Sequence, residues 1–453
     1  MSNILPNSLI KKLGVNPSFD EQAFVEVHEQ GERQNAIRIN DKKIGEAPFS
    51  GVESVPWCRS GFYLRNRPSF TLDPLYHAGS YYSQDASSMF VSHIIEELEL
   101  NNEPIRALDL CAAPGGKTTL LNSFLDDESL LVANEIIKSR VNILMENVIR
   151  WGNSNVVVTN NDPSAFGRLP GYFDLMLVDA PCSGSGMFRK DSSAIDEWSE
   201  ANVKLCKERQ QRILADSIVT LRTGGILLYS TCSYSEEENE DIADWLVKTY
   251  NLKTIRIAIS PEWGIEETRS TQHKAYGYRF YPHKLKGEGF FITVFEKVDD
   301  QETFSRKKIK AEKSDVPNGI LSKWIESPGG HMVFSHHEHL HIFTKRYELD
   351  LKILQNVLYL KLAGTNIGKV AGKELIPSHA LALSNHIKKT IPKLVVTLDE
   401  AQNYLRKESI QPMHMVPNGW ALVYYEGVDL GWVKILSNRI NNYYPKESRI
   451  AHL

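Results

Sequence analysis

Two cysteines stand in short loops in which a reactive thiol is better placed than in an apolar core. Cys182 lies in the segment DAPCSGSG, residues 179–186, and Cys232 lies in STCS, residues 230–233. A buried cysteine is usually an inert apolar residue, but small polar residues surround both of these thiols. In that setting a thiolate can act as a nucleophile toward an electron-poor carbon. Asp179, three residues before Cys182, adds a carboxyl group that can serve as an acid.

A glycine-rich turn, CAAPGGKT at residues 111–118, joins an apolar run to a helix-like stretch. Backbone N–H groups in such a turn approach an anionic or dipolar ligand closely. Its end, Gly116-Lys117-Thr118, resembles a P-loop, but that motif needs a glycine five residues before Gly116, where Cys111 stands. The dinucleotide pattern G-x-G-x-x-G is absent from the turn as well. The turn therefore predicts a Rossmann-like ligand site of another kind.

Three acidic residues follow successive apolar runs. Glu135 lies 19 residues beyond Gly116, close to the spacing of about 20 expected of an acid that binds ribose hydroxyls. Asp162 and Asp179 follow the next two runs. Each acid alone can be a turn or helix-cap residue. Because ligands of parallel sheets bind beyond the carboxyl ends of the strands, we expect the three acids and the glycine turn to face one crevice.

The elements that must position these residues are predicted by hydrophobic periodicity. Between residues 106 and 229, short apolar runs alternate with longer amphipathic stretches, which is typical of β–α–β units in an α/β fold. The predicted strands are 107–110, 130–133, 156–158, 175–178, 226–229 and a final one at 290–295. Residues 203–221 predict a helix packed on the sheet.

An acidic run follows Cys232. Ser235 and Glu238 have the spacing of a capping box, in which serine caps a helix and the glutamate three residues on binds back. We therefore interpret this run as a helix start and assign it no catalytic role.

Cysteine content and hydropathy limit the class of protein. The five cysteines are an odd number without a C-x-x-C pair, which argues against a disulfide framework and against a zinc site, and we predict no metal. The chain begins without a basic segment followed by an apolar one, and no stretch approaches the roughly 20 apolar residues of a membrane span. These features predict a cytoplasmic location.

Charge is distributed unevenly along the chain. The first 300 residues have 31 Lys and Arg against 42 Asp and Glu. Residues 301–453 have 21 Lys and Arg against 14 Asp and Glu. Because Lys and Arg neutralise phosphates, we expect this basic C-terminal third to contact a polyanion. It opens with a charged, linker-like stretch and continues with short β-rich pieces at 341–343, 419–425 and 431–434, which predict small barrels or α+β modules.

Taken together, the motifs resemble those of the RNA 5-methylcytosine methyltransferases of the Nol/Nop/Sun group, which use S-adenosylmethionine. The resemblance covers residues 79–297 and rests on YSQDASSM (82–89), CAAPGGKT, DAPCSGSG, STCSYSEEEN (230–239) and RFYPH (279–283). The C-terminal part, with AGKELIPSHAL at 371–381, is similar to the PUA-like appendage of RsmF-type members, which modify small-subunit ribosomal RNA.

The resemblance implies a class I Rossmann-like methyltransferase sheet with an N-terminal module and C-terminal PUA-like α+β/β-barrel domains. We expect an N-terminal RNA-facing module at 1–100, the methyltransferase core at 101–297 and a charged linker at 298–318. We further expect an accessory domain at 319–390 and a PUA-like RNA-binding domain at 391–453.

The resemblance also implies roles for individual residues. Cys232 matches the nucleophile that adds to carbon 6 of cytosine, Asp179 the acid at the ring nitrogen, and Cys182 the thiol implicated in release of the product. The residues implied to contact S-adenosylmethionine are Cys111, Ala112, Ala113, Pro114, Gly115, Gly116, Lys117, Glu135, Asp162 and Asp179.

The implied partner is RNA, either ribosomal RNA or a ribosomal subunit. Two alternatives remain open at this point. One is a transfer-RNA 5-methylcytosine methyltransferase, because the core motifs do not distinguish the two RNAs. The other is a catalytically inactive RNA-binding scaffold, although both thiols, the glycine turn and all three acids are present together.

Overall fold

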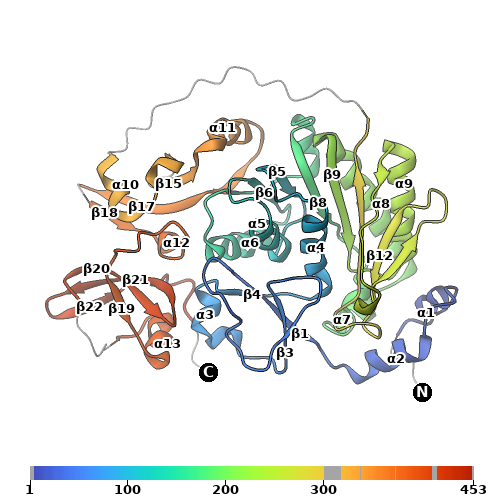
Figure 1. Cartoon of the computed structure of the whole chain (residues 1–453), viewed down its shortest axis with the longest axis horizontal. Helices are drawn as coiled ribbons and strands as arrows, with labels where there is room; N and C mark the ends of the chain where they lie inside the picture. Colours follow the sequence, from blue (N-terminus) through green and yellow to red (C-terminus); the bar gives the residue numbers. More distant parts are fainter. Residues whose placement is uncertain (1–4, 300–317, 337, 373, 411–415, 451–453) are drawn as a thin grey trace.

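The computed structural model describes residues 5–299, 318–336, 338–372, 374–410 and 416–450. Most of the predicted charged linker, residues 300–317, lies outside this part of the chain. Figure 1 shows the central sheet between N-terminal helices on one side and smaller C-terminal sheets on the other. No helix among the described residues is long and apolar enough to cross a bilayer.

The central sheet has ten strands in the described part of the chain, in the order β11-β12-β13-β9-β8-β5-β6-β7-β16, with β10 beside β13. Its strands are β5 (Arg106–Asp109), β6 (Leu130–Asn134), β7 (Val156–Thr159), β8 (Phe173–Asp179), β9 (Leu221–Thr231), β10 (Lys253–Thr254), β11 (Glu266–Arg269), β12 (Tyr276–Phe280), β13 (Phe290–Glu296) and β16 (Leu360–Ala363). The strands β7, β6, β5, β8 and β9 are parallel, and β13 joins β9 in antiparallel register. The loops after the parallel strands therefore meet at one edge of the sheet.

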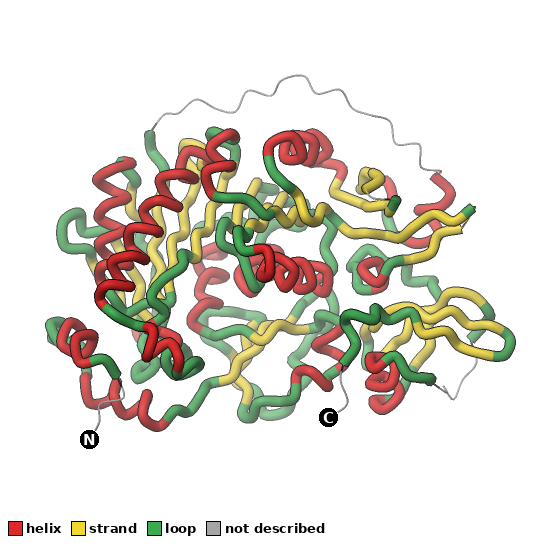
Figure 2. Tube along the Cα trace, turned by 180° about the vertical axis from the view of Figure 1, so that it is seen from behind, coloured by secondary structure: helices red, strands yellow, loops and turns green. Residues whose placement is uncertain are grey.

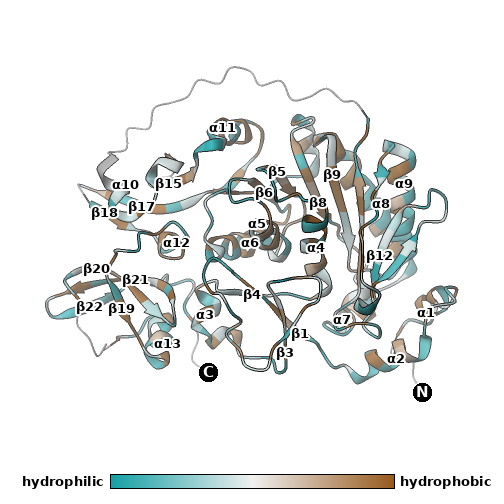
Figure 3. Cartoon of the chain, in the orientation of Figure 1, coloured by the Kyte–Doolittle hydropathy of each residue, from teal (hydrophilic) through white to brown (hydrophobic). Residues whose placement is uncertain are grey.

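Helices cover both faces of this sheet, as Figures 1 and 2 show. They are α4 (Phe90–Glu97), α5 (Gly116–Phe124) and α6 (Lys138–Trp151) on one face, and α8 (Glu200–Ser217), α9 (Glu240–Tyr250) and α11 (Glu348–Val357) on the other. In β5, Ala107 packs into the first core and Leu108 into the second. All residues of β6 and β7 are buried, as expected of parallel strands covered on two faces. Figure 3 shows hydrophobic residues gathered around α5 and α6.

The predicted α/β class and the Rossmann-like sheet are confirmed, and each predicted strand overlaps an observed one. The predicted helix at 203–221 is wrong at its C-terminal end. Helix α8 stops at Ser217, a 3-10 turn covers Ile218–Thr220, and Leu221 already begins β9. Apolar periodicity continues through this junction because Ile218 and Leu221 are buried in the same core as α8.

The N-terminal part forms three helices and a four-stranded antiparallel sheet within the described residues, with α7 of the core nearby (Figure 1). The elements are α1 (Asn7–Leu13), α2 (Glu21–Gln30), β1 (Asn35–Ile39), β2 (Glu53–Ser54), β3 (Gly61–Leu64), α3 (Pro74–His77), β4 (Tyr81–Ser83) and α7 (Ser193–Glu197). Arg38 of β1 is fully buried, and its guanidinium donates to Thr119 Oγ1 at 2.7 Å in the first turn of α5. The N-terminal sheet is thereby attached to the helix that follows the glycine turn.

The C-terminal part contains two further four-stranded sheets. The elements are α10 (Asn318–Trp324), β14 (His331–His336), β15 (His339–Thr344), β17 (Thr365–Ala371), β18 (Glu374–Pro377), α12 (His379–Ala382), β19 (Lys393–Val395), α13 (Leu398–Arg406), β20 (Gly419–Tyr425), β21 (Val428–Leu436) and β22 (Arg439–Asn442). The first sheet has the order β14-β15-β17-β18, and the second β19-β20-β21-β22.

Packing joins parts of the chain that are distant in sequence. Strand β16 extends the central sheet by pairing with β7, and buried Asp350 of α11 accepts from Arg106 Nε of β5 at 2.6 Å. Ile37 and Leu75 of the N-terminal module share one apolar core with Leu394 and Val423 of the last sheet. The first and last modules thus bury their apolar faces against each other.

Candidate active site

The two cysteine loops meet at the carboxyl edge of the sheet. Cys182 follows β8, Cys232 follows β9, and their Sγ atoms lie 3.0 Å apart. Gly186 N donates to Cys232 O at 2.8 Å, so the backbones of the two loops are also joined. A Cβ at Gly186 would lie 2.8 Å from that carbonyl and 2.4 Å from Gly289 O. The close approach of the loops therefore requires glycine at position 186.

Asp179, at the end of β8, lies at the same edge of the sheet. Its carboxylate forms an ion pair with Lys117 Nζ at 2.8 Å and accepts from Ser230 Oγ at 2.7 Å. The Lys117 amine also lies 5.1 Å from the centre of the Phe290 ring. The structure thus brings a residue from the glycine turn directly to the acid beside the thiols.

The surroundings of Cys182 and Lys117 shift the pKa values of both groups. The hydrogen bond to Cys232, with burial, raises the pKa of Cys182 well above its ordinary value. Burial acts to lower the pKa of Lys117, but the carboxylate of Asp179 and the nearby Cys232 outweigh it, so the pKa of Lys117 is raised. Cys182 therefore remains a proton donor, and Lys117 remains a cation.

The glycine turn leads from β5 into α5 as predicted. Ala112 and Ala113 are buried, Cys111 is half-buried and Pro114 is exposed. Gly115 precedes the helix with φ 114°, in the left-handed region that favours glycine. A Cβ at that position would also lie 3.3 Å from Asn147 Cβ and Leu144 Cδ1 of α6.

Glu135 follows β6 and is 3% exposed. Its Oε1 accepts from Ile137 N at 2.8 Å, and its Oε2 lies 3.5 Å from Arg140 Nη1. Ile136 and Ile137 are both nearly half exposed at this edge. An anchored carboxylate next to an exposed apolar surface can bind a ligand that combines hydroxyl groups with a flat ring.

Asp162 is placed differently from the other acids. It follows β7 at the same edge, but it is exposed, and its Oδ1 accepts from Ser164 N at 3.0 Å and from Ser164 Oγ at 2.7 Å. These two hydrogen bonds lower the pKa of Asp162. Asp162 caps a short 3-10 helix, Pro163–Arg168.

Asp109 is a feature of the site that the sequence reasoning missed. It ends β5, is fully buried, and accepts at Oδ2 from Thr118 Oγ1 at 2.6 Å. Its Oδ1 has no hydrogen-bond partner among the described residues. Burial, opposed by the Thr118 bond and assisted by Asp179, raises the pKa of Asp109 to about 7. The available signal was its position, directly before the glycine turn.

The predicted capping box at Ser235 is wrong. The Ser235 side chain caps nothing, and Glu236–Glu238 forms a 3-10 turn before α9. Glu238 turns inward, is fully buried, and accepts hydrogen bonds from Ser183 and Ser233, the residues that follow the two cysteines. Burial with several donors outweighs the local capping preference.

No group of three or more His, Cys, Asp or Glu side chains within the described ranges could hold a metal ion.

Three family models match the chain. The model described as 16S rRNA methyltransferase RsmB/F matches residues 96–296. The N-terminal domain of 16S rRNA methyltransferase RsmF matches 5–86, and the methyltransferase RsmF PUA domain matches 392–450. Among relatives, the ribosomal RNA small subunit methyltransferase F of Salmonella arizonae is 30% identical over 459 residues, covering 95% of this chain and 92% of the relative.

Solved structures agree with this assignment. A methyltransferase homolog protein from Pyrococcus horikoshii is 26% identical with a TM-score of 0.52, covering 65% of this chain and all of that one. NSun6 from the same organism, solved with the S-adenosylmethionine analogue SFG, has a TM-score of 0.54 at 21% identity over 66% of this chain and shows the same fold. The chain belongs to the RsmB/F family of 16S rRNA methyltransferases, with the N-terminal and PUA domains of its RsmF members.

Proposed function

We propose that this enzyme transfers a methyl group from S-adenosylmethionine to carbon 5 of cytosine in small-subunit ribosomal RNA, through a covalent cysteine adduct. The observation that carries the proposal is the pair of thiols, 3.0 Å apart beside Asp179 at the carboxyl edge of the sheet. Family membership supplies the reaction class and the RNA substrate.

The residues at this edge fit S-adenosylmethionine. The unpartnered Oδ1 of Asp109 lies at the glycine turn and suits a cationic group of the cofactor. Glu135 would accept from the ribose hydroxyls, and Ile136 would pack against the adenine ring. When bound, the cofactor supplies an electrophilic methyl group. We also propose that residues 111–117 and Asp162 contact S-adenosylmethionine, because they match the family's motifs.

The nucleophilic step falls to Cys232. Carbon 5 of cytosine is too weak a nucleophile to accept a methyl group directly, so a thiolate must first add to carbon 6. The Cys232 Sγ–C6 bond forms as the C5=C6 electron pair moves toward carbon 5, which then takes the methyl group. Asp179 in its protonated form would donate a hydrogen bond to ring nitrogen 3 and stabilise the charge that the addition places on the ring, while its neighbour Lys117 remains a cation.

Release is the role proposed for Cys182. The carbon-5 proton leaves to water, its electron pair restores the C5=C6 double bond, and the Sγ–C6 bond to Cys232 breaks. Cys182 keeps its proton, because its pKa is raised, and lies 3.0 Å from Cys232 Sγ. Its S–H can therefore hydrogen-bond to the departing thiolate and stabilise it as a leaving group.

The modules around the core are proposed to hold the RNA. We retain the division into 1–100, 101–297, 298–318, 319–390 and 391–453, with RNA contacts from the first and last parts. The shared core of these two modules supports a single RNA-binding unit. The cytoplasmic location stays a prediction.

Bisulfite sequencing of ribosomal and transfer RNA tests the proposal directly. In a deletion strain, one or more cytosines of the small-subunit RNA should lose methylation and regain it when the wild-type chain is supplied. Loss of a transfer-RNA mark alone would assign the enzyme to the other RNA. Unchanged methylation in both RNAs would contradict an active methyltransferase and favour the scaffold.

A further inference from the structure

We propose that Glu238 is a positioning residue that holds the two thiols against each other. This inference rests on the proposed two-cysteine mechanism, to which it adds the element that sets the distance between the reacting groups.

Glu238 connects the two cysteine loops through both of its carboxylate oxygens. Its Oε1 accepts from Ser183 N at 2.7 Å, and its Oε2 accepts from Ser183 Oγ at 2.5 Å and from Ser233 Oγ at 2.6 Å. Ser183 follows Cys182 and Ser233 follows Cys232. One buried side chain therefore fixes the residue next to each thiol.

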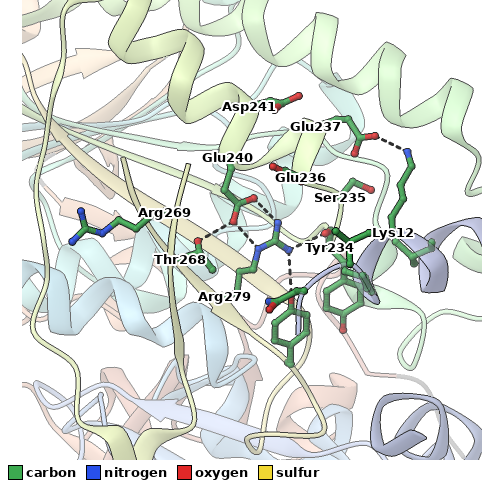
Figure 4. Close-up of a pocket in the computed structure, with 15 residues that line it drawn as sticks. Lys12, Tyr234, Ser235, Glu236, Glu237, Glu240, Asp241, Thr268, Arg269 and Arg279 are labelled. Carbon is green, nitrogen blue, oxygen red and sulfur yellow. Dashed lines mark hydrogen bonds and ion pairs between the residues drawn. The ribbon is translucent and has the colours of Figure 1, made fainter. Parts of the chain in front are cut away.

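The neighbouring acids of the run have other partners. Glu236 and Glu237 line an open pocket of about 590 Å³ behind the loop, and Glu237 forms an ion pair with Lys12 of α1 at 2.6 Å (Figure 4). Glu240 pairs with buried Arg279, whose Nη1 also donates to Tyr234 O at 2.8 Å. Of these four acids, Glu238 is the one that contacts both cysteine loops.

Substitutions of Glu238 can distinguish the effect of its hydrogen bonds from the effect of its negative charge. A serine hydroxyl can donate or accept a hydrogen bond. In Glu238→Gln the amide oxygen can accept from Ser183 N, while the amide N–H₂ donates to the two serine hydroxyls. Glutamine therefore preserves the connection without the negative charge. Alanine removes the acceptor of Ser183 N and leaves the two serine hydroxyls to donate to each other, at 3.2 Å, or to Ser185 Oγ.

Thiol spacing can be measured without methyl transfer. Phenylarsine oxide condenses with two adjacent thiols, forming two As–S bonds and releasing one water molecule. Wild type should bind one equivalent tightly, and Cys182→Ala and Cys232→Ala should not. Glu238→Ala should bind at least tenfold more weakly, whereas Glu238→Gln and the control Glu236→Gln should bind as wild type does.

Turnover provides the second measurement. In Glu238→Ala, kcat should fall about 100-fold, the loss expected for a displacement of about 1 Å, while KM for S-adenosylmethionine stays within threefold. Glu238→Gln should keep kcat within about fivefold. Ser233→Ala removes the contact of Glu238 to the Cys232 loop, together with the contacts of Ser233 Oγ to Ser183, Ser185 and Ser235 N. It should weaken arsenical binding and lower kcat in the same direction.

Three results would overturn the inference. They are wild-type arsenical binding in Glu238→Ala, equal losses in Glu238→Gln and Glu238→Ala, or, where Glu238→Ala fails to fold, wild-type arsenical binding and turnover in Ser233→Ala. Methyl transfer by Cys232→Ala would instead refute the covalent mechanism, and the arsenical binding would still decide the role of Glu238.

Discussion

Asp109 makes the stability of the cofactor-free enzyme depend on pH. The side chain is fully buried, and its pKa is raised from 3.8 to about 7. A carboxyl group whose pKa is raised on folding contributes most to stability below pH 4, and this contribution is lost as the pH rises toward 7. Asp109→Asn removes the titration but retains an oxygen that can accept from Thr118 Oγ1.

The expected size of the effect follows from the shift. One pKa unit corresponds to about 1.4 kcal/mol, so ionising Asp109 between pH 5 and pH 8 should cost the folded wild type about 2–3 kcal/mol. For a core of this size, that corresponds to a change in Tm of about 5–10 °C. The Tm of Asp109→Asn minus that of wild type should therefore be about 5–10 °C more positive at pH 8 than at pH 5.

Scanning calorimetry of the full chain without cofactor measures this difference. Asp196→Asn, at an exposed position of α7, is the control and should follow wild type at both pH values. Saturating S-adenosylmethionine should reduce the advantage of Asp109→Asn at pH 8, because only the carboxylate can pair with a cation of the cofactor. Parallel curves of Tm against pH for wild type and Asp109→Asn would show that Asp109 does not titrate between pH 5 and pH 8 in the folded protein.

Three further outcomes are expected. Cys232→Ala should bind S-adenosylmethionine as wild type does yet retain less than a few per cent of methyl transfer, measured with labelled cofactor; higher turnover would place the nucleophile elsewhere. Glu135→Gln should weaken cofactor binding about 10- to 100-fold in calorimetry, because a hydrogen bond to a charged acceptor contributes about 1.5–3 kcal/mol to the binding free energy. An unchanged Kd would show that Glu135 is not part of the cofactor site. A chain ended after Asp300 should have its Tm lowered by roughly 10 °C or more, because the N-terminal module loses the apolar core it shares with the last sheet; a wild-type Tm would show that this shared core contributes little.

Local sequence patterns predicted the strands of the central sheet and the residues at the ends of these strands, because both depend on residues that are close together in the sequence. The runs at 130–133 and 156–158 became fully buried parallel strands, because strands covered on both faces are apolar throughout. The ends of the predicted strands 107–110, 130–133, 175–178 and 226–229, in turn, located the glycine turn, Glu135 and both thiols at one edge of the sheet.

Local sequence patterns could not predict contacts between segments that are distant in the sequence. Glu238 meets Ser183 across 55 positions, and its local spacing indicated a helix cap instead. The pairing of β16 with β7 and the core shared by the first and last modules join segments separated by hundreds of residues. Lys117, expected at the cofactor, forms its ion pair with Asp179 because folding brings the turn to the end of β8.

In the proposed mechanism, Cys232 forms the bond to cytosine and Cys182 assists in breaking it. The most direct test is denaturing gel electrophoresis of Cys182→Ala after incubation with S-adenosylmethionine and labelled small-subunit RNA. We expect a retarded protein–RNA band that is absent from the Cys182→Ala/Cys232→Ala double variant. A retarded band that survives in the double variant, or normal turnover by Cys182→Ala without any retarded band, would contradict this mechanism.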